Sequence, residues 1–184
     1  MAKQSKNCLA SKSQESKWIL YSVPFLFIIG SLFHFAYDFT GENIIIGFFT
    51  PINESIWEHI KLILTPLLLW WILYYVFKHK KYNINKDRWF NATFFSIITG
   101  IISVPTIYYL YTSALGIESL VIDVLILFFS ILLAQLVGYH CYKYLKGINY
   151  LIPIILIIII VIIFIIFTIS PPELPIFIIK LLFT

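Results

Sequence analysis

The sequence predicts an all-α integral membrane bundle of five transmembrane helices. Of its 184 residues, 60% are hydrophobic and only 12% are charged, and the mean hydropathy of +0.92 lies well above that of soluble domains. Five apolar stretches approach the roughly 20 residues that a helix needs to cross a bilayer. Basic residues gather in alternate linkers between these stretches, as the positive-inside rule requires. Five spans use up nearly all of this length, so residues 18–184 are expected to form one transmembrane domain.

The first 17 residues precede the first span and are polar, with four lysines and one glutamate. This composition predicts a disordered basic tail on the cytoplasmic side. The first span covers about residues 18–39. It is longer than the roughly 7 to 15 apolar residues of a signal-peptide core, and no small-residue cleavage site follows it. A retained helix is therefore expected.

The other spans are predicted at about residues 57–77, 89–111, 119–141 and 150–169. The linkers after spans two and four, KHKKYNINKDR and CYKYLKGIN, are basic. With the amino terminus in the cytoplasm, eleven of the thirteen Lys and Arg residues lie inside, and seven of the nine acids lie at or near the outer face. This predicts a multi-pass protein of the cell membrane whose carboxyl terminus is outside. Because the basic residues are divided among three segments, the net charge of +4 indicates topology in a lipid bilayer and not nucleic-acid binding.

Span five, LIPIILIIIIVIIFIIFTI, has almost no polar side-chain atom, which predicts a helix with much of its surface against lipid. A stiff SPPELP turn follows it. The last nine residues, IFIIKLLFT, reach only about 13 Å as a helix, so they are expected to lie in the outer interface or to pack back on the bundle. Cys8 and Cys141 both fall on the reducing cytoplasmic side, where no disulfide is expected.

The segment after span one, TGENIIIGFFT (residues 40–50), is apolar but too short to cross a bilayer. It is expected either to lie in the interface or to dip back as a re-entrant lid. Gly41 and Gly47 are candidate hinges for such a lid.

Ionisable side chains of three helices are predicted to meet in one layer near the outer face. Counting about 1.5 Å per residue places His34 and Asp38 near the outer end of span one. The same count places Glu58 and His59 at the start of span two, and Asp123 one turn into span four. His34 with Asp38, Glu58 with Lys61, and Asp123 fall on polar stripes of their helices, and such stripes face the bundle interior because charges are costly in lipid. Helices one to four are therefore expected to surround an outward-opening polar pocket, with helix five outside them.

The stretch PINESIWEH (residues 51–59) also has a purely structural interpretation. Ser55 and Glu58 fit a capping box, in which both side chains satisfy backbone donors at a helix start. His59 and Lys61 lie deeper and need partners, and Glu58 with Lys61 forms a plausible i,i+3 ion pair.

The chemistry of this layer allows three interpretations. The predicted pocket residues are His34, Asp38, Asn53, Glu54, Glu58, His59, Lys61 and Asp123. His34 and Asp38, together with Glu54, Glu58 and His59 from the next helix, are a reasonable ligand set for a divalent metal such as zinc, although the spacing matches no specific zinc signature. Alternatively, neighbouring carboxylates form a proton acceptor, or the whole set is a structural network that fastens the helices together.

The residues HFAYDFTGEN (34–43), FFTPINESIWEHIKLILTP (48–66) and the late PPELPIF (171–177) resemble a family of small multi-spanning prokaryotic membrane proteins known only as a domain of unknown function. The NESxWEH core carries most of this resemblance, which covers most of the chain. It supports the architecture and the location of the site and implies no reaction. One departure is the apolar end, IIKLLFT, where further polar residues are expected from the family pattern.

Three functions are compatible with the sequence. The leading one is binding of a small ligand, an ion, a lipid headgroup or a protein partner at the polar layer. The alternative is a membrane-embedded metal-dependent hydrolase of a lipid or peptide, with ligands or an acid and base drawn from His34, Asp38, Glu58 and His59. The third is proton- or ion-coupled transport, which is weaker because the inner half offers little beyond Gln135 and His140 to complete a path.

Overall fold

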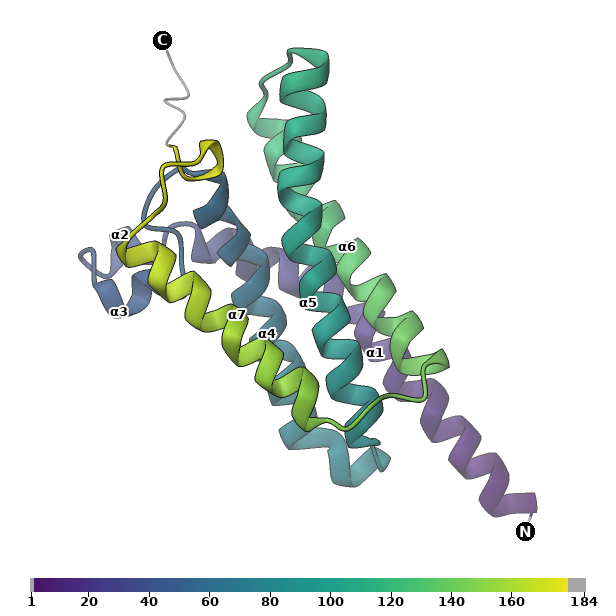
Figure 1. Cartoon of the computed structure of the whole chain (residues 1–184). Helices are drawn as coiled ribbons and strands as arrows, with labels where there is room; N and C mark the ends of the chain where they lie inside the picture. The colour runs from purple at the N-terminus through teal and green to yellow at the C-terminus, as the bar shows by residue number, and fades with distance from the viewer. Residues whose placement is uncertain (1, 179–184) are drawn as a thin grey trace.

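The computed structural model describes residues 2–178, and the side chains of residues 17–178. Every regular element in this part of the chain is a helix (Figure 1), which confirms the all-α class. The elements are α1 (Ala2–Phe33), α2 (Ala36–Phe39), α3 (Ile44–Gly47), α4 (Ile56–Tyr82), α5 (Lys86–Tyr109), the π-helical turn η1 (Leu110–Ala114), α6 (Leu120–Tyr144), α7 (Leu151–Ile169) and the 3₁₀ turn η2 (Pro175–Phe177).

Within the described residues, four helices are long and apolar enough to cross a membrane: α4, α5 with η1, α6 and α7. The apolar part of α1 is shorter, from Lys17 to Phe33, which is about 25 Å of helix. The predicted first span, 18–39, is not continuous, because α1 ends at Phe33 and α2 starts separately at Ala36. A crossing of the membrane by α1, which would make five spans, stays a prediction. The helix α1 begins at Ala2 and so includes residues 2–17, and the disordered basic tail stays a prediction.

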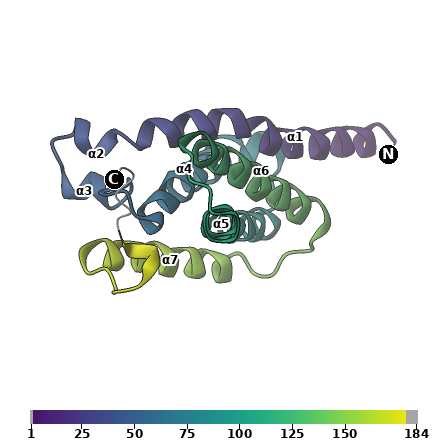
Figure 2. The ribbon, with the colours of Figure 1, turned by 90° about the horizontal axis from the view of Figure 1, so that it is seen from above.

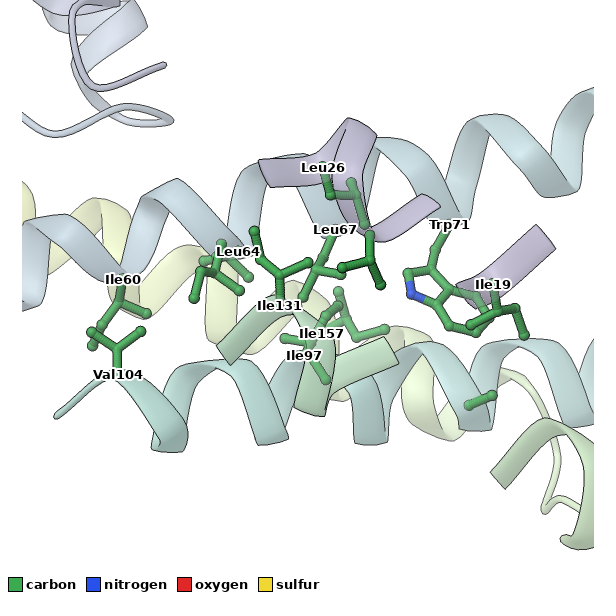
Figure 3. Packing of buried hydrophobic residues seen from close by; sticks show 14 of the residues in the cluster. Ile19, Leu26, Ile60, Leu64, Leu67, Trp71, Ile97, Val104, Ile131 and Ile157 are labelled. Carbon is green, nitrogen blue, oxygen red and sulfur yellow. The ribbon is translucent and has the colours of Figure 1, made fainter. Parts of the chain in front are cut away.

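The hydrophobic core lies where α1, α4, α5 and α6 meet. Figure 3 shows Leu26 of α1, Leu67 of α4, Ile97 of α5 and Ile131 of α6 packed together, and all four side chains are fully buried. The helix α7 lies at the edge of the bundle seen from above (Figure 2). Only 22% of its most apolar 18-residue stretch is buried, which is the smallest share among the four candidate spans.

Two glycines allow the helices to approach closely. A Cβ atom on Gly30 of α1 would lie 2.6 Å from the carbonyl oxygen of Leu62 in α4. A Cβ atom on Gly100 of α5 would lie 2.7 Å from a side-chain carbon of Ile63, also in α4. Small residues at such crossings increase van der Waals contact between helices that gain little from the hydrophobic effect in lipid.

A buried polar network joins the same four helices. The Gln135 side-chain oxygen on α6 accepts hydrogen bonds from Trp71 Nε1 of α4 (3.1 Å) and Ser96 Oγ of α5 (3.2 Å). Its amide nitrogen donates to Ser22 Oγ of α1 at 2.6 Å. All four side chains are buried. Gln135, which the sequence offered only as part of a transport path, is therefore a hub that cross-links the helices.

The segment between α1 and α4 is folded back beside the bundle. Its short helices α2 and α3 lie together at one side (Figure 1), and its exposed large apolar side chains include Phe35, Phe39, Ile44, Ile45 and Phe49. Gly41 has φ of +68°, a conformation suited to glycine. A Cβ atom on buried Gly47 would lie 2.5 Å from a side-chain carbon of Ile52, so Gly47 serves close packing. The two placements of residues 40–50, in the interface or as a re-entrant lid, stay predictions.

At the carboxyl end, the predicted turn after α7 leads into η2. Residues 179–184 lie outside the described part of the chain, and with them most of the predicted interfacial tail. The side chain of Cys8 is outside it too. Cys141 is a buried free thiol.

Candidate functional site

The start of α4 sets the positions of the polar side chains. Ser55 is the N-cap residue, and its Oγ accepts a hydrogen bond from the Glu58 backbone N–H at 3.3 Å. Asn53 supports this turn, because its side-chain oxygen accepts from the Ser55 N–H at 2.9 Å. The serine half of the predicted capping box is confirmed. The glutamate half differs, because the Ser55 N–H donates to Asn53 and Glu58 Oε2 accepts instead from the N–H of Ile52 at 3.0 Å.

Glu58 and Lys61 form a buried ion pair on one side of α4. Lys61 Nζ lies 2.6 Å from Glu58 Oε2, and the two residues are only 0% and 2% exposed, respectively. Lys61 also donates to the carbonyl oxygen of Gly47 at 2.7 Å. Thr168 Oγ1 of α7 donates to Glu58 Oε1 at 3.3 Å. The predicted i,i+3 pair is confirmed, and it ties the preceding loop and α7 to the start of α4.

His34, Glu54 and His59 form a second group, here called the cation cluster, on another side of α4. The Nε2 atoms of His34 and His59 lie 3.3 Å apart. Glu54 Oε2 lies 3.3 Å from His59 Nε2 and 3.7 Å from His34 Nε2. The side chains are one-third to one-half exposed, so the cluster is open on one side. Among residues 17–178, these three form the group whose ligand atoms are close enough together for a metal ion.

Hydrogen bonding fixes which atom of His59 faces the cluster. Its Nδ1 lies 2.8 Å from the carbonyl oxygen of Ser55. Because a carbonyl only accepts, Nδ1 must carry the proton, and in the neutral ring Nε2 then presents a lone pair. That lone pair faces the carboxylate of Glu54 and the ring of His34. Such an arrangement is favourable only when a proton or a metal cation lies among the three atoms.

Glu54 supplies the negative charge of the cation cluster. A hydrogen bond from the protonated His59 ring lowers the pKa of the Glu54 carboxyl group, and this outweighs the opposite effect of its partial burial. The carboxylate is therefore ionised at neutral pH and available to a cation.

Two of the three separations within the cluster match those between ligands of a tetrahedral zinc ion, and the third is slightly longer. With metal–ligand bonds of about 2.0 to 2.1 Å, the edges of a tetrahedron are about 3.3 to 3.4 Å. The observed separations are 3.3, 3.3 and 3.7 Å. Two histidines and one carboxylate are also a donor set that zinc uses.

The structure divides the predicted polar layer into separate groups. Of the predicted metal ligands, the structure brings together His34, Glu54 and His59, while Glu58 pairs with Lys61. Neighbouring residues on a helix point about 100° apart, so Glu58 and His59 face different partners. Asp38 lies on α2 and is exposed, because the end of α1 at Phe33 removes it from the helical face of His34.

Asp123 belongs to a third group. Its side chain, in the first turn of α6, accepts a hydrogen bond from the hydroxyl of Tyr111 in the π-helical turn η1. The predicted depth of Asp123 is that of the histidines, and residue spacing did not specify Tyr111 as its partner. Glu54 was among the predicted pocket residues and metal ligands, and the structure places it beside His34 and His59.

Comparison with known proteins gives a family and no function. A family model described as "Family of unknown function (DUF6512)" matches residues 8–182. No curated protein and no solved structure matches the chain.

Proposed function

Since the chain belongs to this family of unknown function, as its resemblance predicts, we propose a role that is argued from its own residues. The chain is a membrane protein that binds a divalent cation of the zinc class through His34, Glu54 and His59. The observation that carries this proposal is the convergence of three donor atoms at separations of 3.3, 3.3 and 3.7 Å. The three side chains come from the end of α1, a loop and the start of α4. The distances between their donor atoms are close to the edge length of a tetrahedral site.

The surroundings of His59 support the same proposal. A histidine that ligates a metal usually donates its other ring N–H to a carbonyl or carboxylate, which fixes the ring and the tautomer. Ser55 supplies that carbonyl at 2.8 Å. Ser55 is itself fixed as the helix cap, so the ring orientation follows from the way α4 begins.

Three protein ligands leave the fourth position of a tetrahedral ion for water or another small ligand, as in zinc sites that bind or polarise a ligand. The exposed half of Glu54 indicates that this position faces away from the core. Under the topology that the basic linkers predict, with the amino terminus cytoplasmic, it would face the outside of the cell.

Of the three functions that the sequence allows, binding has the strongest support. For the hydrolase alternative, Glu58 was a candidate acid or base, but it is engaged by Lys61 and Thr168. For transport, Gln135 was a candidate for the inner path, but its amide is committed to Ser22, Trp71 and Ser96.

Metal binding by the purified protein tests the proposal. After treatment with a chelator, the protein in detergent is titrated with zinc by calorimetry and its metal content is measured. We expect one ion per chain, and loss of stoichiometric binding in His34→Ala, His59→Ala and Glu54→Gln. Asp38→Asn and His79→Ala are matched controls that keep the ion, because neither residue belongs to the cluster. Absence of zinc from the unaltered protein, or equal loss in Asp38→Asn, would contradict the proposal.

A further inference from the structure

A long apolar groove lies between α1 and α4, away from the cation cluster. Its volume is about 490 Å³, within the roughly 300 to 1,000 Å³ typical of ligand sites. Five lining residues belong to α1, from Phe25 to Phe33, and seven belong to α4, from Pro66 to Lys78. Lys78 is the charged residue of this lining, and the other residues are apolar or aromatic.

The dimensions of the groove suit a lipid tail. The lining positions on α4 extend over about 18 Å, at about 1.5 Å per residue. Half of a hydrocarbon core of roughly 30 Å is about 15 Å, so the groove is as long as one leaflet is deep. Its borders are open to the bilayer, since Leu32, Leu69 and Phe77 are 64%, 44% and 73% exposed. A tail can therefore enter sideways.

One wall of the groove is supported by stacked aromatic rings. Trp70 stacks on Tyr74 with ring centroids 5.2 Å apart, and Tyr74 stacks in turn on Trp89 of α5 at 5.3 Å. An apolar surface that is already ordered loses little conformational entropy when it is covered.

The charge of the groove lies at one end. Lys78 is in the last turns of α4, close to Lys80 and Lys81. Basic residues at the end of a span attract anionic headgroups, at about 1 kcal/mol per Lys near the surface, and basic pockets between spans bind them specifically. A long apolar groove with one ammonium group at its end complements a molecule with a long tail and an anionic head.

We propose that the groove between α1 and α4 binds one acyl chain of an anionic phospholipid, whose phosphate pairs with Lys78. The apolar lining recognises the chain, and Lys78 selects the anionic head over a zwitterionic one. This site shares no residue with the cation cluster, so either proposal can fail without the other.

Lipid retention measures this binding directly. The full chain is reconstituted with equal amounts of phosphatidylglycerol and phosphatidylcholine, extracted in mild detergent and analysed by native mass spectrometry. We expect one retained phosphatidylglycerol per chain, and about a tenfold loss of the preference over phosphatidylcholine in Lys78→Gln, which corresponds to about 1.4 kcal/mol. Lys78→Arg keeps the preference, and Lys81→Gln is the matched control for surface charge.

A second pair of variants tests the groove itself. Leu69→Trp fills it and lowers the retention of both lipids, whereas Leu133→Trp, at a comparably exposed position of α6, does not. Thermal unfolding verifies that each variant is folded. Equal effects of Lys78→Gln and Lys81→Gln would overturn the proposal, as would unchanged retention in Leu69→Trp or dimers of this chain that Leu69→Trp dissociates. Displacement of the lipid by millimolar inorganic phosphate would also overturn it, because the acyl chain would then contribute nothing.

Discussion

Trp57 at the start of α4 packs against Phe177 of η2, with ring centroids 4.8 Å apart. Trp57 also stacks on Phe164 of α7 at 4.3 Å and 16° between the ring planes. The two segments that carry the family resemblance, around NESIWEH and PPELPIF, therefore lie against each other although about 110 residues separate them in the chain. Their shared role in the structure is to fasten the end of α7 to the start of α4.

Phe177→Ala should weaken this contact. An aromatic pair contributes about 0.5 to 1.5 kcal/mol beyond the area that it buries, and Phe177 is partly buried, so we expect a loss of about 1 to 2 kcal/mol in the free energy of unfolding. Denaturation in mixed detergent micelles measures it. Phe39→Ala is the control, because Phe39 is 87% exposed, and an equal effect there would show that the contact contributes nothing specific.

Lys61→Met should destabilise the protein strongly. It leaves the carboxylate of Glu58 buried without its cation, and breaking a buried ion pair on one side costs about 3 to 5 kcal/mol. It also removes the donor to the carbonyl of Gly47, so limited proteolysis should cut near residues 47–52 more rapidly. The double variant Glu58→Gln with Lys61→Met should regain part of the stability, and Lys80→Met should have no effect. A neutral Lys61→Met variant would contradict the role of the pair.

Gln135→Leu should weaken the packing of the four core helices. It leaves Ser22, Trp71 and Ser96 without their partner, and orphaned buried groups cost about 1 to 3 kcal/mol each in soluble proteins. Measured interhelical hydrogen bonds in membranes average about 0.6 kcal/mol, so we expect a total of about 1 to 2 kcal/mol. Leu136→Ala, on the exposed side of α6, is the control. Stability equal to that of the unaltered chain would mean that the network is replaceable by apolar packing.

The predicted five-span topology requires α1 to cross the bilayer. Single cysteines in place of Lys17 and Glu42, both exposed, should then react with a membrane-impermeant thiol reagent from opposite sides of sealed vesicles. Cys8 and Cys141 are first replaced by Ser. Labelling of both positions from the same side would mean that α1 lies along the surface and that four helices cross.

Local rules predicted much of the site. The N-cap at Ser55 and the pair of Glu58 with Lys61 follow from spacing within one helix, and the structure has both. The apolar stretches also predicted the all-α class and, among five spans, the four that correspond to the long helices α4, α5, α6 and α7. These features depend on neighbours in the chain, which a sequence displays directly.

The direction in which each side chain points, and therefore its partner on another helix, could not be predicted in this way. Counting residues gives the depth of Glu58 and His59 but not the helices that each one faces, and they face different partners. The end of α1 at Phe33 has no glycine or proline to signal it, so Asp38 was expected on the same face as His34. Thr168 reaches Glu58 from 110 residues away, a contact that only the assembled bundle defines.

His34 and Glu54 lie at the two ends of the folded-back segment that contains α2 and α3, while Lys61 holds the same segment near its middle through Gly47. A cation bound to both residues would close that segment into a ring, as a disulfide does, and would remove conformational freedom from the open chain. The ion would then act as a removable cross-link, and its departure would lengthen the tether between α1 and α4 without breaking a covalent bond.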